Sequence, residues 1–130
     1  MDPATRITDA EWEVMEALWP RESCTAAEVV QALATARDWT ETTIKTMLTR
    51  LVKKGVLEAS REGRRFHYRA ICTRDEAVKA QAGRLLDRVG TKDTSPLLSF
   101  FVEHGNLQAP DVAALRELLD QLEGSEEGDR

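Results

Sequence analysis

The sequence has few of the features that mark secreted proteins and membrane proteins. It contains two cysteines in 130 residues, aromatic residues make up 5% of it, and its apolar runs are only a few residues long. A transmembrane helix needs about 18 or more consecutive apolar residues, so no membrane insertion is expected. The N-terminal residues have no apolar core of the kind a secretory signal requires, so the protein is expected in the cytoplasm.

Residue types that perform catalysis or bind metals occur at spacings that suit neither task. Cys24 and Cys72 form no CxxC pair and are expected to be reduced thiols. His67 and His104 are isolated from each other and from any nucleophile. No glycine-rich phosphate-binding loop is present. The sequence therefore predicts a protein that is not an enzyme and that uses no metal and no cofactor.

The formal net charge of -5 conceals a strong asymmetry along the chain. Residues 37–92 carry 14 Lys and Arg against 7 Asp and Glu, a net charge of +7, whereas residues 1–36 sum to -5 and residues 93–130 to -7. A basic middle between acidic ends is a candidate anion-binding surface. The alternative is that the excess basic residues only solvate a helix face.

Three helices are predicted before residue 55. Thr8 and Glu11 have capping-box spacing at the start of a helix over residues 9–19, and Thr25 and Glu28 repeat that spacing before a shorter second helix. Thr40 opens a third helix, whose apolar positions share one half of the helical wheel, and Gly55 provides its stop. The first helix has an apolar stripe that includes two tryptophans, interpreted as core.

An alternating pattern after Gly55 predicts a β-hairpin. Residues 56–60 and 66–70 are expected to be its strands, joined by a loop over residues 61–65 that carries three arginines. Phe66 is expected to contribute to the core. Three helices followed by a basic hairpin make a winged helix-turn-helix, in which the third helix is the candidate recognition helix.

The rest of the chain is predicted to be helical, with one helix over residues 73–89, a short apolar one beginning at Ser95 and Pro96, and a last one beginning at Pro110. Helices this short bury their apolar faces poorly on their own, and a second copy of the chain is expected to cover these faces. Packing back on the winged domain is the alternative. The candidate dimerisation residues are Leu85, Leu86, Leu97, Leu98, Phe100, Phe101, Val112, Leu115, Leu119 and Leu122.

The expected architecture is mainly α with a small β-hairpin. A winged helix-turn-helix DNA-binding domain occupies residues 1–72, a helical dimerisation region residues 73–123, and a disordered acidic tail residues 124–130.

The polar face of the third helix suits the major groove of DNA, and the hairpin arginines suit phosphates or the flanking minor groove. A winged-helix module that joins proteins in a complex is the alternative function. The candidate DNA-binding residues are Thr42, Thr43, Lys45, Thr46, Thr49, Arg50, Lys53, Arg61, Arg64 and Arg65.

Three strings of residues resemble those of the BlaI/MecI family of penicillinase and methicillin-resistance repressors. They are Ile7-Thr8-Asp9-Ala10-Glu11-Trp12-Glu13-Val14-Met15, Thr42-Thr43-Ile44-Lys45-Thr46-Met47-Leu48-Thr49-Arg50-Leu51 and Phe66-His67-Tyr68-Arg69-Ala70. The resemblance covers nearly the whole chain and weakens toward its end.

The resemblance implies a homodimeric bacterial repressor that binds an inverted-repeat operator of double-stranded DNA and controls a β-lactam resistance operon or a related stress operon. It also implies inactivation by a protease pathway linked to a membrane receptor. The family is cleaved at an Asn-Phe pair in the dimerisation region, and the aligned residues here are Phe100-Phe101 or Ser99-Phe100. Phe100 and Phe101 are therefore the candidate cleavage site.

Overall fold

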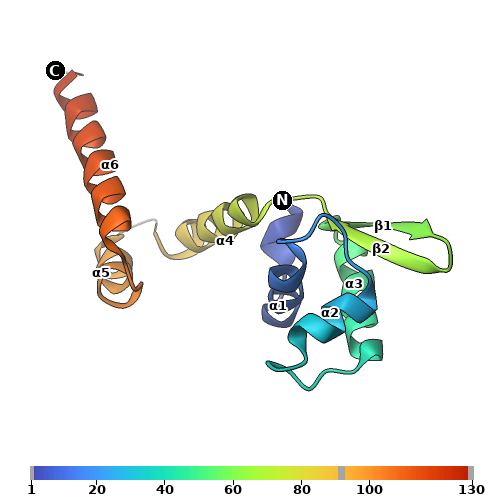
Figure 1. Ribbon diagram of the computed structural model, residues 1–130. Helices are drawn as coiled ribbons and strands as arrows, with labels where there is room; N and C mark the ends of the chain where they lie inside the picture. The colour runs from blue at the N-terminus through green and yellow to red at the C-terminus, as the bar shows by residue number, and fades with distance from the viewer. Residues whose placement is uncertain (1, 91–92, 129–130) are drawn as a thin grey trace. The chain divides into compact units, whose positions relative to one another are not determined.

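The computed structural model describes residues 2–90 and 93–128, with side chains through Ser125. It consists of two compact units, Met1–Arg88 and Val89–Arg130 (Figure 1). The first unit contains the short 3-10 helix η1 (Pro3–Arg6), the helices α1 (Asp9–Leu18), α2 (Ala26–Leu33) and α3 (Glu41–Lys53), the strands β1 (Leu57–Glu62) and β2 (Arg65–Ala70), and nearly all of α4 (Arg74–Val89). The second contains α5 (Ser95–His104) and α6 (Ala109–Gly128).

The helices of the first unit begin where the threonine caps predicted them. Thr8 and Glu11 form a complete capping box at α1, and Thr25 and Glu28 form another at α2. The Thr40 hydroxyl accepts a hydrogen bond from the Thr43 N–H at the start of α3. Gly55 follows the end of α3 with a φ of 83°, a left-handed conformation that glycine adopts without strain.

The core of the first unit lies between α1, α2, α3 and the start of β1. Its fully buried larger side chains include those of Val14, Met15, Leu18, Val29, Ile44, Leu48, Leu51, Val56 and Leu57. Trp12 and Trp19 pack against this core at its edge, with ring centroids 5.1 Å apart. The interpretation of these tryptophans as structural therefore agrees with their packing.

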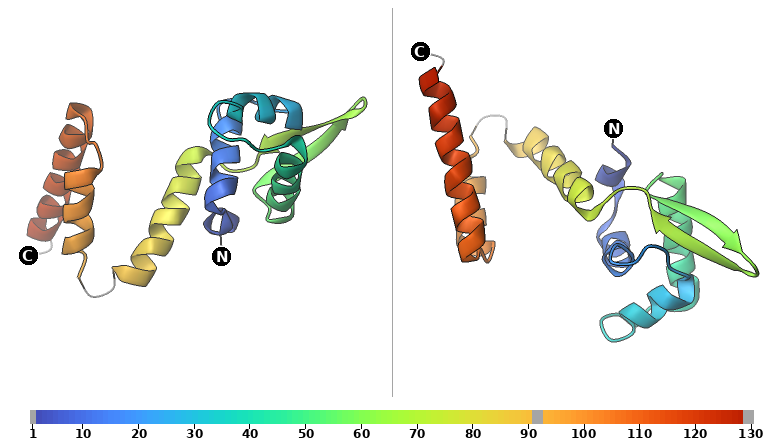
Figure 2. Two further views of the ribbon diagram at one scale, coloured as in Figure 1. Left: turned by 90° about the horizontal axis from the view of Figure 1, so that it is seen from below. Right: turned by 45° about the horizontal axis from the view of Figure 1, so that its top comes forward.

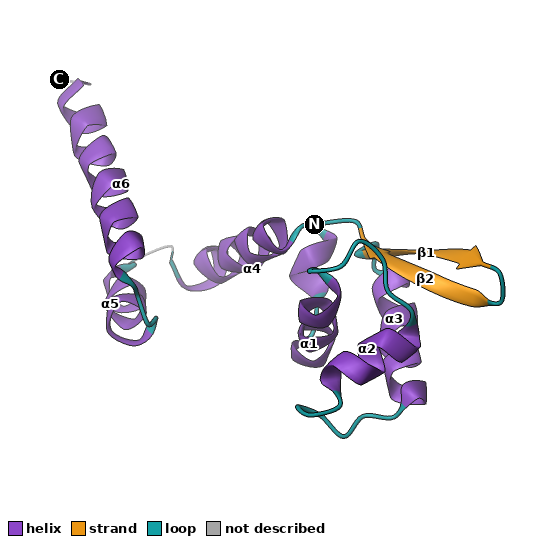
Figure 3. Ribbon diagram, viewed as in Figure 1, coloured by secondary structure: helices purple, strands orange, loops and turns teal. Residues whose placement is uncertain are grey.

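The strands β1 and β2 form an antiparallel hairpin, called the wing below (Figure 3). Its register pairs Leu57 with Ala70 and Ala59 with Tyr68, as the alternating pattern indicated. The connecting loop is shorter than predicted, because Arg61 and Arg65 belong to the strands and only Gly63 and Arg64 form the turn. Gly63 has a φ of 64°, as the first position of a type II′ turn requires.

Two other predictions are corrected. Phe66 is 52% exposed and is not part of the core, because its cross-strand partner is the exposed Arg61 near the end of the wing. The last helix continues through Gly128, so residues 124–128 are helical where a disordered tail was predicted, and residues 129–130 lie outside the described part.

Helix α4 packs on the winged unit, so the division between the units falls after residue 88 and not after the predicted residue 72. Ala77 is fully buried, and the side chains of Gln81 and Arg84 donate hydrogen bonds to the carbonyl oxygens of Ala4 and Thr5 in η1, each at 2.8 Å. The Trp19 indole N–H also donates to the Cys72 carbonyl oxygen at 3.0 Å, just before α4.

A buried ion pair joins the start of α1 to the end of α3. Glu11 is 2% exposed, and its carboxylate accepts hydrogen bonds from the Thr8 N–H and from the Lys54 ammonium, which also donates to the Arg6 carbonyl oxygen. Burial raises the pKa of Glu11, but the hydrogen bonds from Lys54 and Thr8 outweigh it and hold the pKa below its ordinary value. The ionised carboxylate is thus part of the folded structure.

We expect Glu11→Gln to lower the free energy of unfolding by about 1–3 kcal/mol at pH 7, because Lys54 loses its charged acceptor. The folded-state pKa of Glu11 lies below the unfolded one, so the contribution is complete above the ordinary glutamate pKa of about 4.3 and disappears as the pH falls through the lower folded value. Urea unfolding of both proteins at neutral and acidic pH measures this. The difference between them should shrink in acid, and an unchanged difference would contradict the assignment.

Candidate nucleic-acid interface

Helix α3 has one buried face and one exposed face. Ile44, Met47, Leu48 and Leu51 are buried against α1, α2 and β1. The helical period then places the polar side chains outward. The exposed residues of this face are Thr42, Lys45, Thr46, Thr49, Arg50 and Lys53.

The threonine hydroxyls of this face already have partners within the helix. Thr46 Oγ1 donates to the carbonyl oxygen of Thr42 at 3.0 Å, and Thr49 Oγ1 donates to that of Lys45 at 2.9 Å. Their hydroxyl protons are therefore used, while the oxygen lone pairs and the γ-methyl groups are available to a ligand. Thr43 has a different position, since its N–H and hydroxyl both lie against the Thr40 cap.

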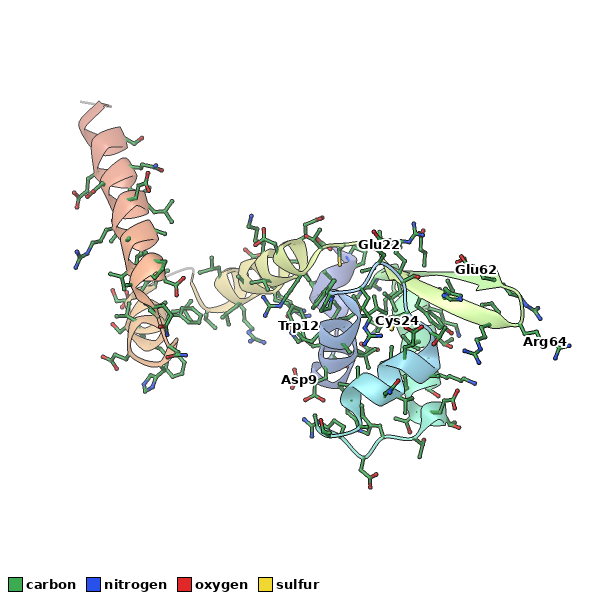
Figure 4. All side chains as sticks on the ribbon, viewed as in Figure 1. Asp9, Trp12, Glu22, Cys24, Glu62 and Arg64 are labelled. Atoms are coloured by element: carbon green, nitrogen blue, oxygen red, sulfur yellow. The ribbon has the colours of Figure 1, made fainter. Side chains whose placement is uncertain are left out.

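The wing carries the other predicted site residues. Arg64 extends from the tip of the hairpin (Figure 4), and the Arg61 guanidinium lies 5.9 Å from the centre of the Phe66 ring. The base of the wing is tied to the segment before α2, because Cys24 and Tyr68 exchange two backbone hydrogen bonds of 3.0 and 2.8 Å. This bridge adds a third extended segment beside β2 and fixes the wing next to α2 and α3.

A hollow of about 440 Å³ brings α3, the wing and the start of α2 together. Of the predicted residues, Lys45, Thr49, Arg64 and Arg65 line it. Its other lining residues are Thr25, Ala26, Ala27, Glu41, Phe66 and Tyr68. Arg61 is not among them, and Thr42, Thr46, Arg50 and Lys53 line a neighbouring shallow hollow along the outer face of α3, together with Lys45 and Thr49.

Trp39 lies beside the first turns of α3 and was not identified from the sequence. It lines a hollow of about 320 Å³ with Thr42, Thr43, Thr46 and Arg50. The Arg37 guanidinium lies 5.6 Å from its ring centre and also binds the Glu13 carboxylate, with an Nε–Oε2 distance of 2.7 Å. These hydrogen bonds hold the pKa of Glu13 below its ordinary value.

Sequence reasoning also missed Glu41, Phe66 and Tyr68 as residues that line the hollow beside the outer face of α3. The acid at the first position of α3 was visible in the sequence, because residues four apart on a helix are adjacent and Glu41 precedes Lys45 by four. Their carboxylate and ammonium groups are 3.4 Å apart. The positions of Phe66 and Tyr68 depend on the Cys24 bridge, which joins segments 44 residues apart and has no local signal.

The predicted dimerisation residues lie on α4, α5 and α6. Leu98, Phe100, Phe101, Leu119 and Leu122 are all about half exposed or more, and α5 has no buried residue. Within the second unit α5 and α6 run side by side (Figure 2), connected through Asn106, which has a φ of 53°. Several large apolar side chains are thus exposed on these two helices, as is typical of interaction surfaces.

The described part of the chain has no cluster of side chains that could bind a metal ion, because no three His, Cys, Asp or Glu side chains converge there. Burial raises the pKa of both Cys24 and Cys72, which keeps these thiols protonated at neutral pH. None of the described helices is long and apolar enough to cross a membrane.

The family model described as penicillinase repressor matches residues 7–121. The chain belongs to the penicillinase repressor family. The family expected from the sequence is therefore confirmed, and so is the fold class, mainly α with a winged helix-turn-helix.

Relatives of this chain include two repressor proteins and the solved structure of a DNA-binding domain. The penicillinase repressor of Bacillus licheniformis is 31% identical over 121 residues, covering 93% of this chain and 94% of that protein. The methicillin resistance regulatory protein MecI of Mammaliicoccus sciuri is 29% identical over 122 residues, covering 93% and 99%. The solution structure of the DNA binding domain of the repressor BlaI aligns with a TM-score of 0.52 and 39% identity, over 58% of this chain and 93% of that domain.

Proposed function

We propose that this chain is a homodimeric, non-enzymatic transcriptional repressor that reads an inverted-repeat operator with α3 and the wing. One observation carries the proposal: the outer face of α3 and Arg64 and Arg65 of the wing form one continuous surface around a shared hollow. Family membership supports the same function. Because operator DNA is its proposed target, the protein acts in the cytoplasm.

The recognition helix supplies short polar side chains and flexible cations. In the major groove the γ-methyl groups of Thr46 and Thr49 contact thymine methyls. Lys45 and Arg50 reach guanine edges, while Thr42, Thr43 and Lys53 contact bases or the sugar–phosphate backbone nearby. Few of these contacts are strong, so one winged domain alone binds DNA weakly.

The wing positions the protein more than it reads sequence. Arg64 and Arg65 line the same hollow as Lys45 and meet the phosphates that flank the major groove or the adjacent minor groove. The Arg61 guanidinium, which lies over the Phe66 ring, supplies a further positive charge to the DNA phosphates beside the wing.

Dimerisation through α4, α5 and α6 places two winged domains on the two halves of the operator. The exposed apolar side chains of α5 and α6 need cover, and a second copy provides an identical, complementary surface. Binding to the second half-site then becomes intramolecular and gains from effective concentration. The dimer blocks transcription of a β-lactam resistance operon or a related stress operon, as the names of its relatives suggest.

Inactivation acts on α5. A protease pathway linked to a membrane receptor cuts at Phe100–Phe101, in the middle of this helix. Cleavage in the middle of α5 destroys the apolar surface and separates the two reading domains without altering α3. The operator is released because each half binds weakly alone.

Substitutions in α3 and in the wing should differ in their effect on specificity. We expect Lys45→Ala to cost about 1–3 kcal/mol on the operator and little on random DNA, because it removes a base contact. Arg64→Ala or Arg65→Ala should weaken both DNAs and reduce the log–log salt slope by about 0.9. Fluorescence anisotropy over a salt series measures both quantities. Equal losses on the two DNAs for Lys45→Ala would refute this division, and weak salt dependence of the unaltered protein would favour a protein partner.

The hydrogen bond from the Thr46 hydroxyl to the Thr42 carbonyl oxygen allows a test of which Thr46 group contacts the DNA. Thr46→Val keeps the outward methyl group, and we expect it to bind the operator nearly as well as the unaltered protein. Thr46→Ser removes the methyl and should lose about fourfold in affinity, the equivalent of one buried methylene. Titration of both variants on the same duplex decides between methyl and hydroxyl recognition. A larger loss for the valine variant would show that the hydroxyl oxygen reads the base.

Disruption of α5 should abolish cooperative binding without altering DNA reading. We expect Phe101→Asp to be folded, largely monomeric, and much weaker on a two-half-site operator, with nearly unchanged affinity for a single half-site. Loss of a buried phenylalanine contact costs about 1.5–3 kcal/mol, and it occurs twice in a symmetric dimer. Ser99→Asp introduces the same charge on the same helix at a polar position and serves as the control. Sedimentation and gel-shift titration report both properties, and a dimeric Phe101→Asp protein with normal operator binding would refute the coupling.

A further inference from the structure

The recognition surface contains an acid where phosphate repulsion would disfavour one. Glu41 is the first residue of α3, is 55% exposed, and lines the 440 Å³ hollow between α3 and the wing together with Lys45, Arg64 and Arg65. Its carboxylate lies 3.4 Å from the Lys45 ammonium. An acid at this position opposes the attraction of DNA by the surrounding cations, so its presence on this surface calls for a physical explanation.

The ion pair changes which groups Lys45 can bind favourably. A lysine ammonium has three N–H donors, so it can donate to Glu41 and still donate to a neutral acceptor such as guanine O6 or N7. A phosphate at the same point would bring a second negative charge beside the carboxylate. The pair of Glu41 and Lys45 is therefore compatible with a base edge and disfavours the phosphate backbone.

We propose that Glu41 is a specificity-determining residue, which lowers the affinity of Lys45 for phosphates and so makes it a reader of bases. This inference rests on the proposed function, because it assumes that α3 enters DNA. In random DNA the contacts are mainly to phosphates, and Glu41 reduces them. On the operator Lys45 binds a base edge and keeps its carboxylate partner.

Glu41 also has a structural contribution that the test must separate. An acid in the first turn of a helix is favoured by the helix dipole, and the pair at positions i and i+4 adds to helix stability. Both effects would appear in the melting temperature. Neither would alter the ratio of affinities for two DNAs.

The experiment compares the full-length protein with Glu41→Gln on two duplexes. One is the duplex that the unaltered protein selects from a randomised pool, and the other is a scrambled duplex of the same length and base composition. We expect Glu41→Gln to bind the scrambled duplex about three- to tenfold more tightly with a salt slope steeper by about 0.9, and the selected duplex within about twofold of the unaltered protein. Discrimination between the two DNAs should fall accordingly.

The matched control is Asp75→Asn. Asp75 forms an i,i+4 pair with Lys79 on α4 at 3.0 Å, both side chains are 77% exposed, and neither lines the hollow beside α3. It makes the same change in net charge, so we expect no change in the ratio of affinities.

The outcomes are distinguishable. A change in discrimination for Glu41→Gln alone supports the proposal. Equal effects of Glu41→Gln and Asp75→Asn, equal gains on the two duplexes, or a changed melting temperature with an unchanged ratio overturn it and leave the proposed function intact. If the unaltered protein selects no duplex and its DNA binding depends little on salt, the proposed function and this inference both fail.

Discussion

The orientation of α3 depends on the buried pair of Glu11 and Lys54. This pair fixes the C-terminal end of α3 to the beginning of α1, and the same lysine binds the Arg6 carbonyl oxygen of η1. The chain then turns at Gly55 and enters β1, so the first strand of the wing begins directly after α3. Helix α4 is attached to η1 through Gln81 and Arg84. The pair of Glu11 and Lys54 therefore joins α1, η1 and the end of α3, from which the chain continues into the wing.

Local signals predicted most of the helices because their causes are local. The threonine caps of α1, α2 and α3 act within four residues. The turn after α3 needs a left-handed backbone conformation at residue 55, which glycine adopts without strain. The sequence-based predictions were wrong where the structure depends on tertiary packing or on the length of an element. The apolar Phe66 fits the alternation of a buried strand, but its strand extends beyond the helices that could cover it. The tail after residue 123 has a composition that favours disorder, yet α6 continues through Gly128.

The candidate site was predicted to a similar extent for similar reasons. Once Ile44, Met47, Leu48 and Leu51 are assigned to the core, the helical period alone determines the outer face of α3. The partners of that face come from other segments, and no local pattern indicates them. Trp39 depends on the path of the loop before α3, and the position of the wing depends on the bridge between Cys24 and Tyr68. The boundary after residue 88 likewise follows from contacts of α4 with η1, which are distant in sequence.

The internally bonded threonines of α3 have a consequence for how this protein can evolve. Thr46 and Thr49 contribute nothing to the buried face, and their hydroxyls satisfy only carbonyl groups that the helix already uses. Replacement of either residue therefore leaves folding almost unaffected while changing the groups presented outward. Under the proposed function such exchanges change the DNA target while the scaffold remains folded. A duplicated gene can then acquire a new regulatory target without passing through unfolded intermediates.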